Sequence, residues 1–249
     1  MQAFLFFGQS RRIRRNFVRS GSYAMGLLYL VRHGQASFGA ADYDNLSELG
    51  RKQAVRLGEY FRENGQSFHT VFTGTLRRHG QTWAGIAEGL QPEQSLSVIE
   101  RSGLNEYDPV AIIQAIHPEP LVQPKTPEDI RNHFRLLRDG LAAWMKGQSA
   151  PQGMSSYPEF LAGVTTALDE IRNAHFGKNV LIASSGGPIS TAVGHILGAS
   201  HEGTIDLNLR IRNSSVSEIV FTPRRHSLVT YNTLPHLDGK AYADWVTYA

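Results

Sequence analysis

The stretch LLYLVRHG, residues 27–34, puts an arginine and a histidine directly after a short apolar run. The first five residues are aliphatic or aromatic, and a run of this length that ends near a glycine is typical of a buried strand. Arg32 and His33 are then expected at the carboxyl end of that strand, where Gly34 allows a turn or a close backbone approach. Taken alone, the triplet fits a solvated strand end and a functional site equally well.

The same pattern of short strands returns along the chain and alternates with helical periodicity. Further strands are expected within residues 69–74, 96–100 and 179–184, and a final pair of strands within 214–232. Helices are expected within residues 46–64, 75–90, 155–177 and 188–198, the first with Ser47 as its N-cap. Strands that alternate with helices predict an α/β fold, a three-layer α/β/α sandwich with a mainly parallel but mixed sheet.

Several chemically active side chains follow the expected strands. In sheets of this kind ligands bind outside the carboxyl ends of the strands, so the loops that leave those ends meet. The loops after residues 31, 72, 99 and 183 bring together one set of candidates: Arg32, His33, Arg78, Glu106, Ser185, Gly186 and Gly187. Because these loops converge, Arg32 and His33 at the end of the first strand are predicted to be part of a functional site.

These residue types fit phosphate chemistry. Two arginine forks and the amides of a helix N-terminus bind phosphate oxygens. Neighbouring positive charge disfavours the imidazolium, so His33 is expected to be neutral and able to attack phosphorus. The arginines would stabilise charge during transfer, and Glu106 would give the leaving alcohol its proton if burial raises the pKa of its carboxyl.

At this point the chain resembles a known family. LVRHGQAS at 30–37 is similar to the first motif of the histidine phosphatase superfamily, the phosphoglycerate mutase-like proteins. LSELGRKQA, TGTLRRHGQT and GLNEYD resemble the segments that follow, and Gln81–Thr82 set the register that assigns the second arginine to Arg78. The resemblance implies a phosphoglycerate mutase-like sandwich, a phosphohistidine intermediate at His33, and neither a metal nor another cofactor.

One departure from the family pattern concerns the last motif, at the end of the strand expected within 179–184. The family usually ends that strand with a histidine before two glycines, whereas this chain has Ser185 there. Losing such a contact can cost about 10²–10³ in rate, by analogy with a lost oxyanion donor. His195 is a poor substitute because it lies further along the next helix, roughly 15 Å away at 1.5 Å per residue.

We therefore expect a metal-independent phosphatase that hydrolyses a small phosphorylated metabolite. Three alternatives stay open. The pocket could bind a phosphorylated ligand with weak or no turnover, or the protein could be a phosphoglycerate mutase-type phosphotransferase. Residues 183–187 also approach the G-x-S-x-G elbow, which would make Ser185 an acyl nucleophile with Asp206 and either His226 or His236 as partners. The remaining histidines, His79 among them, show no metal-ligand spacing and are interpreted as surface or packing residues.

Composition bounds the organisation of the chain. Residues 1–24 hold five arginines and no acid, so the net charge of +3 leaves −2 for residues 25–249. The leader is expected to be a disordered or spurious extension ahead of Met25, and 25–249 a histidine phosphatase-like domain. Within that domain, 109–150 is a candidate substrate-side helical insertion.

The same numbers bound the partners. The body has no basic surplus for nucleic acid and no apolar run long enough for a membrane, and the chain has no cysteine. We therefore expect a cytoplasmic protein that acts on a small phosphorylated substrate, without nucleic-acid or membrane partners. The oligomeric state is not fixed by the sequence, and a homodimer remains open.

Overall fold

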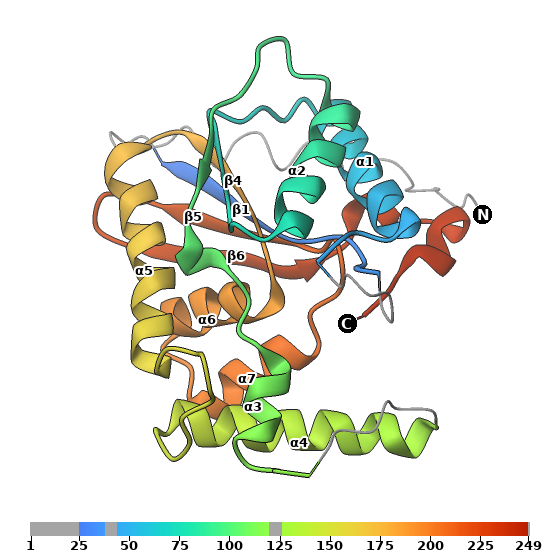
Figure 1. The fold of residues 1–249 in the computed structure, drawn as a ribbon. Coiled ribbons are helices and arrows are strands. Elements are labelled where there is room, and N and C mark those ends of the chain that lie inside the picture. Colours follow the sequence, from blue (N-terminus) through green and yellow to red (C-terminus); the bar gives the residue numbers. More distant parts are fainter. Residues whose placement is uncertain (1–24, 38–43, 120–125, 249) are drawn as a thin grey trace, which may run out of the picture.

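The computed structural model describes residues 25–37, 44–119 and 126–248 (Figure 1). The predictions made for residues 1–24 lie outside these ranges. The described strands form one six-stranded sheet in the order β3-β2-β4-β1-β5-β6. The strands are β1 Gly26–Arg32, β2 Thr70–Thr73, β3 Val98–Glu100, β4 Asn179–Ser184, β5 Val216–Phe221 and β6 His226–Thr233.

The apolar run that opened the sequence analysis is a central strand of this sheet. β1 pairs in parallel with β4 on one side and antiparallel with β5 on the other. β2 runs parallel to both β3 and β4, and β5 forms an antiparallel hairpin with β6. The predicted mixed, mainly parallel sheet is therefore confirmed, together with the final pair of strands.

The described helices follow the predicted positions, with one addition. They are α1 Glu48–Glu63, α2 Arg77–Leu90, α3 Pro109–Gln114, α4 Pro127–Met145, α5 Tyr157–Ala174, α6 Gly186–Leu197 and α7 His201–Leu209, with 3₁₀ turns at Ser102–Leu104, Pro235–Leu237 and Lys240–Trp245. Ser47 caps α1 as expected, since its hydroxyl accepts a hydrogen bond from the Gly50 amide at 3.0 Å. α7 was not predicted.

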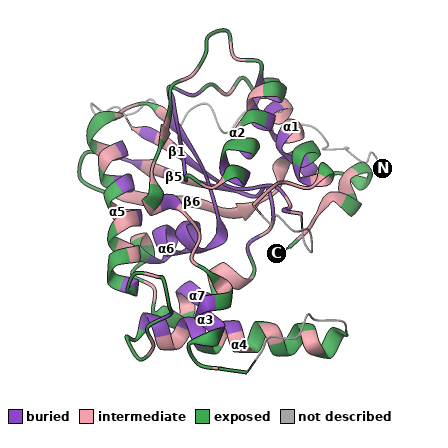
Figure 2. Ribbon diagram, viewed as in Figure 1, coloured by how far each residue is buried: buried purple, intermediate pink, exposed green. Residues whose placement is uncertain are grey.

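Helices cover both faces of the sheet. Successive side chains of a strand point to opposite faces, and in β1 Tyr29 and Val31 pack with α1 and α2, whereas Leu28 and Leu30 pack with α5 and α6. A strand that is buried on both faces has to be apolar throughout, which explains the continuous run at its centre. Figure 2 shows the resulting buried layer between the two helical layers, the predicted α/β/α sandwich.

The helical segment after β3 builds a separate apolar cluster at one end of the molecule. Ile112 of α3 and Leu141 and Trp144 of α4 pack together with Ile205 of α7. Figure 1 shows α4 lying across the ends of α3 and α7. Throughout the described part of the chain, none of the helices has the length and apolar character that crossing a bilayer requires.

Candidate active site

The carboxyl ends of β1 and β4 lie next to each other and organise the site. Arg32 is in register with Ser184, and the amide of His33 donates to the Ser184 carbonyl at 2.8 Å. The residues that follow these two strands are therefore adjacent, so His33 lies beside the turn that contains Ser185. The sequence predicted this meeting of loops from the order of strands and helices alone.

His33 is buried and held in one protonation state. Its side chain is only 4% exposed, and Nδ1 lies 2.7 Å from the Gly34 carbonyl oxygen. Because a carbonyl can only accept, Nδ1 carries the proton, and a neutral ring then holds its lone pair on Nε2. Burial, and after it the charges of Arg32 and Arg78, lower the pKa of His33 well below 6.5. The imidazole is thus neutral at physiological pH, with its lone pair on Nε2.

Two buried guanidinium groups flank this region. Arg32 donates through Nη1 to the Ile211 carbonyl at 2.5 Å, and it is 5% exposed. Arg78 is 6% exposed, and its Nη1 donates to a carboxylate oxygen of Asp44 at 2.9 Å. The neighbouring Arg77 is exposed, so the register chosen from the sequence selected the buried arginine of the pair.

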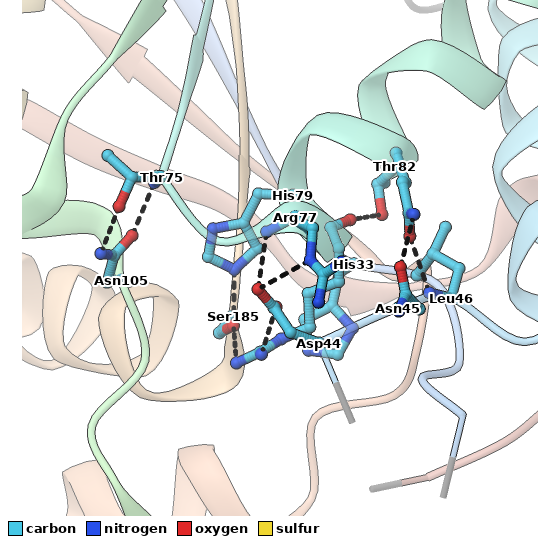
Figure 3. A network of polar contacts seen from close by, with 12 residues as sticks. His33, Asp44, Asn45, Leu46, Thr75, Arg77, His79, Thr82, Asn105 and Ser185 are labelled. Carbon is cyan, nitrogen blue, oxygen red and sulfur yellow. Dashed lines mark hydrogen bonds and ion pairs between the residues drawn. The ribbon is translucent and has the colours of Figure 1, made fainter. Parts of the chain in front are cut away.

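Asp44 is a residue that sequence reasoning missed. Its carboxylate accepts hydrogen bonds from the Arg78 side chain and from the Arg77 backbone amide, the latter at 2.9 Å (Figure 3). It therefore fixes both the start of α2 and the direction of the Arg78 fork. An aspartate in a polar loop gives no periodic signal, and only its three-dimensional neighbours reveal the role.

Glu106 lies against the first turn of α6. The Gly187 amide donates to its two carboxyl oxygens at 3.0 and 3.2 Å. An ideal Cβ at position 187 would come within 2.1 Å of Glu106 Oε1, so only glycine permits this approach. Burial raises the pKa of Glu106 above 4.5, although the Gly187 hydrogen bond and the two arginines oppose it. The carboxyl is thereby able to hold a proton for transfer.

This contact bears on one prediction about the phosphate pocket, which stays a prediction. The Gly187 amide was expected to bind phosphate, but it already donates to Glu106. The glycine therefore contributes space and a hydrogen bond to the acid. Gly186 lies at the other side of the turn, where an ideal Cβ would be 3.8 Å from Nε of Arg32.

His79 was interpreted as a surface or packing residue, and its burial excludes the surface position. His79 is fully buried, and its Nε2 lies 2.7 Å from the hydroxyl oxygen of Ser185. Its ring centroid is 5.9 Å from that of His33. The sequence does carry a signal for this position, because His79, Thr82 and Ile86 follow each other at helical spacing and all three are buried.

Two of the partners proposed for an acyl nucleophile, Asp206 and His236, are engaged elsewhere. Asp206 forms an ion pair with Arg138, and His236 is hydrogen-bonded to the Ser214 hydroxyl at 2.9 Å. The hydroxyl of Ser185 instead meets His79 and, at 3.5 Å, Nη2 of Arg78. Nothing in this geometry supports an Asp-His-Ser triad built from those residues.

No metal-binding cluster occurs within 25–37, 44–119 and 126–248. In those ranges no group of three or more histidine, aspartate or glutamate side chains is arranged to hold an ion. That the reaction needs no metal stays a prediction.

Comparison with known proteins identifies the family. The model of the histidine phosphatase superfamily, branch 1, matches residues 28–234, which include every residue of the candidate site. The chain belongs to the histidine phosphatase superfamily. The resemblance of its first motif to that superfamily is therefore confirmed.

The proteins to which this chain is similar include a phosphatase and phosphoglycerate mutases. A metal-independent phosphoserine phosphatase of Arabidopsis thaliana is 25% identical over 222 residues, 86% of this chain and 84% of the relative. A 2,3-bisphosphoglycerate-dependent phosphoglycerate mutase of Methylorubrum populi is 35% identical over 88 residues, but this match spans only 33% of the chain and 41% of the mutase. The histidine phosphatase fold is also seen in a phosphoglycerate mutase structure from Bacillus anthracis str. Sterne, with a TM-score of 0.61 at 18% identity, covering 86% of this chain and 96% of that one.

Proposed function

We propose that this protein is a metal-independent phosphatase that hydrolyses a small phosphorylated metabolite through a phosphohistidine intermediate at His33. The observation that carries the proposal is the buried, neutral imidazole at the end of β1, flanked by the guanidinium groups of Arg32 and Arg78. Membership of the histidine phosphatase superfamily and similarity to a phosphatase along most of the chain support it.

The reaction has two steps. Nε2 of His33 attacks phosphorus, the new N–P bond forms as the ester P–O bond breaks, and Glu106 gives its proton to the leaving alkoxide oxygen. Water then attacks the phosphohistidine, Glu106 takes a proton from that water, and the N–P bond breaks to release phosphate. The proton and the nitrogen lone pair are both restored, so the cycle closes without any other reactant.

The charges around His33 support the transfer step. Arg32 and Arg78 are fixed by the Ile211 carbonyl and by Asp44, so their remaining N–H groups are oriented before substrate arrives. Preorganised donors of this kind act where negative charge develops on the phosphoryl oxygens. The Ser185 hydroxyl adds a further polar group on the side of β4.

Substrate choice is proposed to depend on residues 109–150. α3 begins directly after Glu106 and Tyr107, and the Tyr107 hydroxyl accepts a hydrogen bond from Asn208 of α7 at 2.5 Å. Leu141 and Trp144 of α4 border a small cavity that also reaches Gly187. This helical segment is therefore connected to the acid and to the first turn of α6.

A phosphoglycerate mutase-type phosphotransferase is the second candidate. The 35% identity to the Methylorubrum populi mutase over 88 residues favours it. A mutase must shield the phosphohistidine from water and return the phosphoryl group. A serine at position 185 makes this controlled return of the phosphoryl group harder, so we place hydrolysis first. Location in the cytoplasm and a homodimer stay predictions.

The test is hydrolysis of an aryl phosphate in the presence of a chelator, comparing the wild type with His33→Ala. We expect activity in the wild type, loss of it in His33→Ala, and normal activity in the control His195→Ala, because His195 is exposed on α6. An acid-labile phosphoenzyme should form only when His33 is present. Equal rates for wild type and His33→Ala would remove His33 from the chemistry, and phosphate binding without turnover would favour a binding protein.

A further inference from the structure

The turn after β4 contains a serine where the family resemblance implies a histidine, and the structure supplies a histidine from another element. His79 comes from the first turn of α2, and Figure 3 shows its ring directed at the Ser185 hydroxyl. Both side chains are fully buried. The serine at position 185 is therefore accompanied by an imidazole from α2 that contacts its hydroxyl directly.

We propose that His79 is a positioning residue for phosphoryl transfer: its Nε2–H holds the Ser185 oxygen so that the serine hydroxyl proton is directed at a phosphoryl oxygen. The pair replaces the second histidine with a neutral donor that is assembled from two elements. This inference rests on the proposed function and names how that site contacts its substrate.

The surroundings of the His79 ring assign its proton. Nδ1 is buried and has no hydrogen-bond partner among the described residues. An ideal Cβ on Gly74 would lie 2.3 Å from Nδ1, so this nitrogen faces the Cα of Gly74, whose C–H groups can only donate. A buried N–H without an acceptor is less tolerated than a buried lone pair. The proton is therefore on Nε2, the nitrogen that faces Ser185.

A count of donors at Ser185 then fixes the direction of its hydroxyl. A hydroxyl oxygen has two lone pairs and one proton. His79 Nε2–H points to this oxygen at 2.7 Å, and Arg78 Nη2–H points to it at 3.5 Å. With both lone pairs engaged, the remaining function of Ser185 is to donate, and an anion held by Arg78 is the acceptor within reach.

Electrostatics are consistent with a neutral pair. Burial, and after it the charge of Arg78, lower the pKa of His79 to about 3, whereas Asp44 acts in the opposite direction. His79 is therefore neutral at physiological pH and adds no positive charge beside His33. A second imidazolium is not needed, because Arg32 and Arg78 already supply the positive charge.

The experiment compares His79→Leu with His79→Gln, alongside Ser185→Ala and the double variant His79→Leu/Ser185→Ala. Leucine fills a similar volume without a donor, whereas the glutamine amide can place an N–H near the position of Nε2. We expect His79→Leu and Ser185→Ala each to lower kcat about 10- to 100-fold with KM changed by less than about threefold. His79→Gln should retain activity within about threefold, and the double variant should be no slower than the slower single variant.

Several results would overturn the proposal. His79→Leu with wild-type kcat would do so, as would a double variant whose loss is the product of the two single losses. Equal losses for His79→Gln and His79→Leu, with thermal melting unchanged, would show a packing role. If His79→Leu does not fold, the small effect of His79→Gln must vanish in the Ser185→Ala background, and persistence of that effect would contradict the coupling.

Failure of the underlying function is distinguishable. Absence of turnover in the wild type, or turnover that survives His33→Ala, contradicts the proposed function and not the contact between His79 and Ser185. The same four variants are then compared by their affinity for inorganic phosphate. Non-additive losses of affinity would support the pair, and independent or absent effects would overturn it.

Discussion

Two helices begin at the candidate site, α2 and α6, and their first turns contribute opposite things. The first turn of α2 delivers side chains: Arg78 and His79 are both buried and both reach Ser185. The first turn of α6 instead provides space, because Gly187 lets Glu106 come close to the backbone and Gly186 does the same for Asn208. One turn carries the chemical groups and the other makes room for groups from elsewhere.

The comparison teaches that a helix N-terminus can serve a site in two ways. In α6 the amide of Gly187 is used on a protein carboxyl, Glu106, and so supports the proposed acid. In α2 Asp44 accepts hydrogen bonds from the Arg77 amide and from the Arg78 side chain, so one carboxylate fixes both the start of the helix and the orientation of Arg78. Substitutions in the two turns should therefore lower activity for different reasons. Those in α2 remove functional groups, whereas those in α6 fill space that Glu106 needs.

The largest effect is expected from removing the side chain that α2 aims at the site. Arg78→Ala should lower kcat/KM by about 10³, because it removes a fixed donor to the phosphoryl group and a partner of Ser185. Arg77→Ala is the matched control, one residue away and exposed, and should stay within about threefold of the wild type, as is typical of a rim charge. Steady-state kinetics on one phosphate ester measure both variants. Equal losses of kcat/KM in Arg78→Ala and Arg77→Ala would contradict a special role for Arg78.

The next effect concerns the acid that α6 supports. Glu106→Gln should lower kcat on an alkyl phosphate by about 10², since a poor leaving group needs its proton. The raised pKa of Glu106 keeps the acid form present to higher pH, so kcat/KM should fall as pH rises through that pKa. The lowered pKa of His33 moves the loss on the acid side to well below pH 6.5.

The pH profile of the variant provides the control for this prediction. Glu106→Gln should lose the alkaline fall that belongs to the enzyme but keep any change that comes from ionisation of the substrate phosphate. An unchanged alkaline limb in Glu106→Gln would assign the proton donation to another group. A nitrophenyl ester, with its better leaving group, should show a smaller loss in this variant.

The smallest effect on activity is expected from replacing a glycine in either turn by alanine, which adds one methyl group. Gly187→Ala should lower kcat about tenfold, because its Cβ displaces the Glu106 carboxyl from its hydrogen bond. Gly80→Ala in α2 is the matched change, with no atom within 4 Å of the new Cβ. It should leave kcat unchanged and raise stability by about 0.5–1 kcal/mol, the helix preference for alanine, measured by urea unfolding. Comparable activity losses in Gly187→Ala and Gly80→Ala would contradict the distinction between the two turns.

The elements that position the site could be predicted because their signals are local. β1 and β4 are uninterrupted apolar runs, and Ser47 begins α1 through a contact three residues away. The alternation of strands and helices then predicted which edge of the sheet gathers Arg32, His33, Arg78 and Glu106. Fold and location of the candidate site therefore followed from periodicity and from the rule for parallel sheets.

The features that sequence reasoning missed depend largely on contacts between different elements. His79 was passed over because the buried face of α2 was sought among apolar residues, whereas its first turn buries polar ones. Asp44 acts through contacts with Arg77 and Arg78, more than thirty positions away. α7 buries only Thr204 and Ile205, so it presents no apolar stripe. Long-range polar pairing is not a periodic property, and sequence spacing cannot reveal it.

The pairing of β1 determines when this protein can become functional during its synthesis. β1 is translated early, yet both strands that hydrogen-bond to it, β4 and β5, come from the last third of the chain. Until residue 184 has left the ribosome, β1 has no native partner strand, and its other edge stays open until residue 221 has followed. Contacts so distant in sequence form slowly. Nascent chains should therefore depend on chaperones at this stage, and any truncation before β5 leaves the His33 loop without its framework.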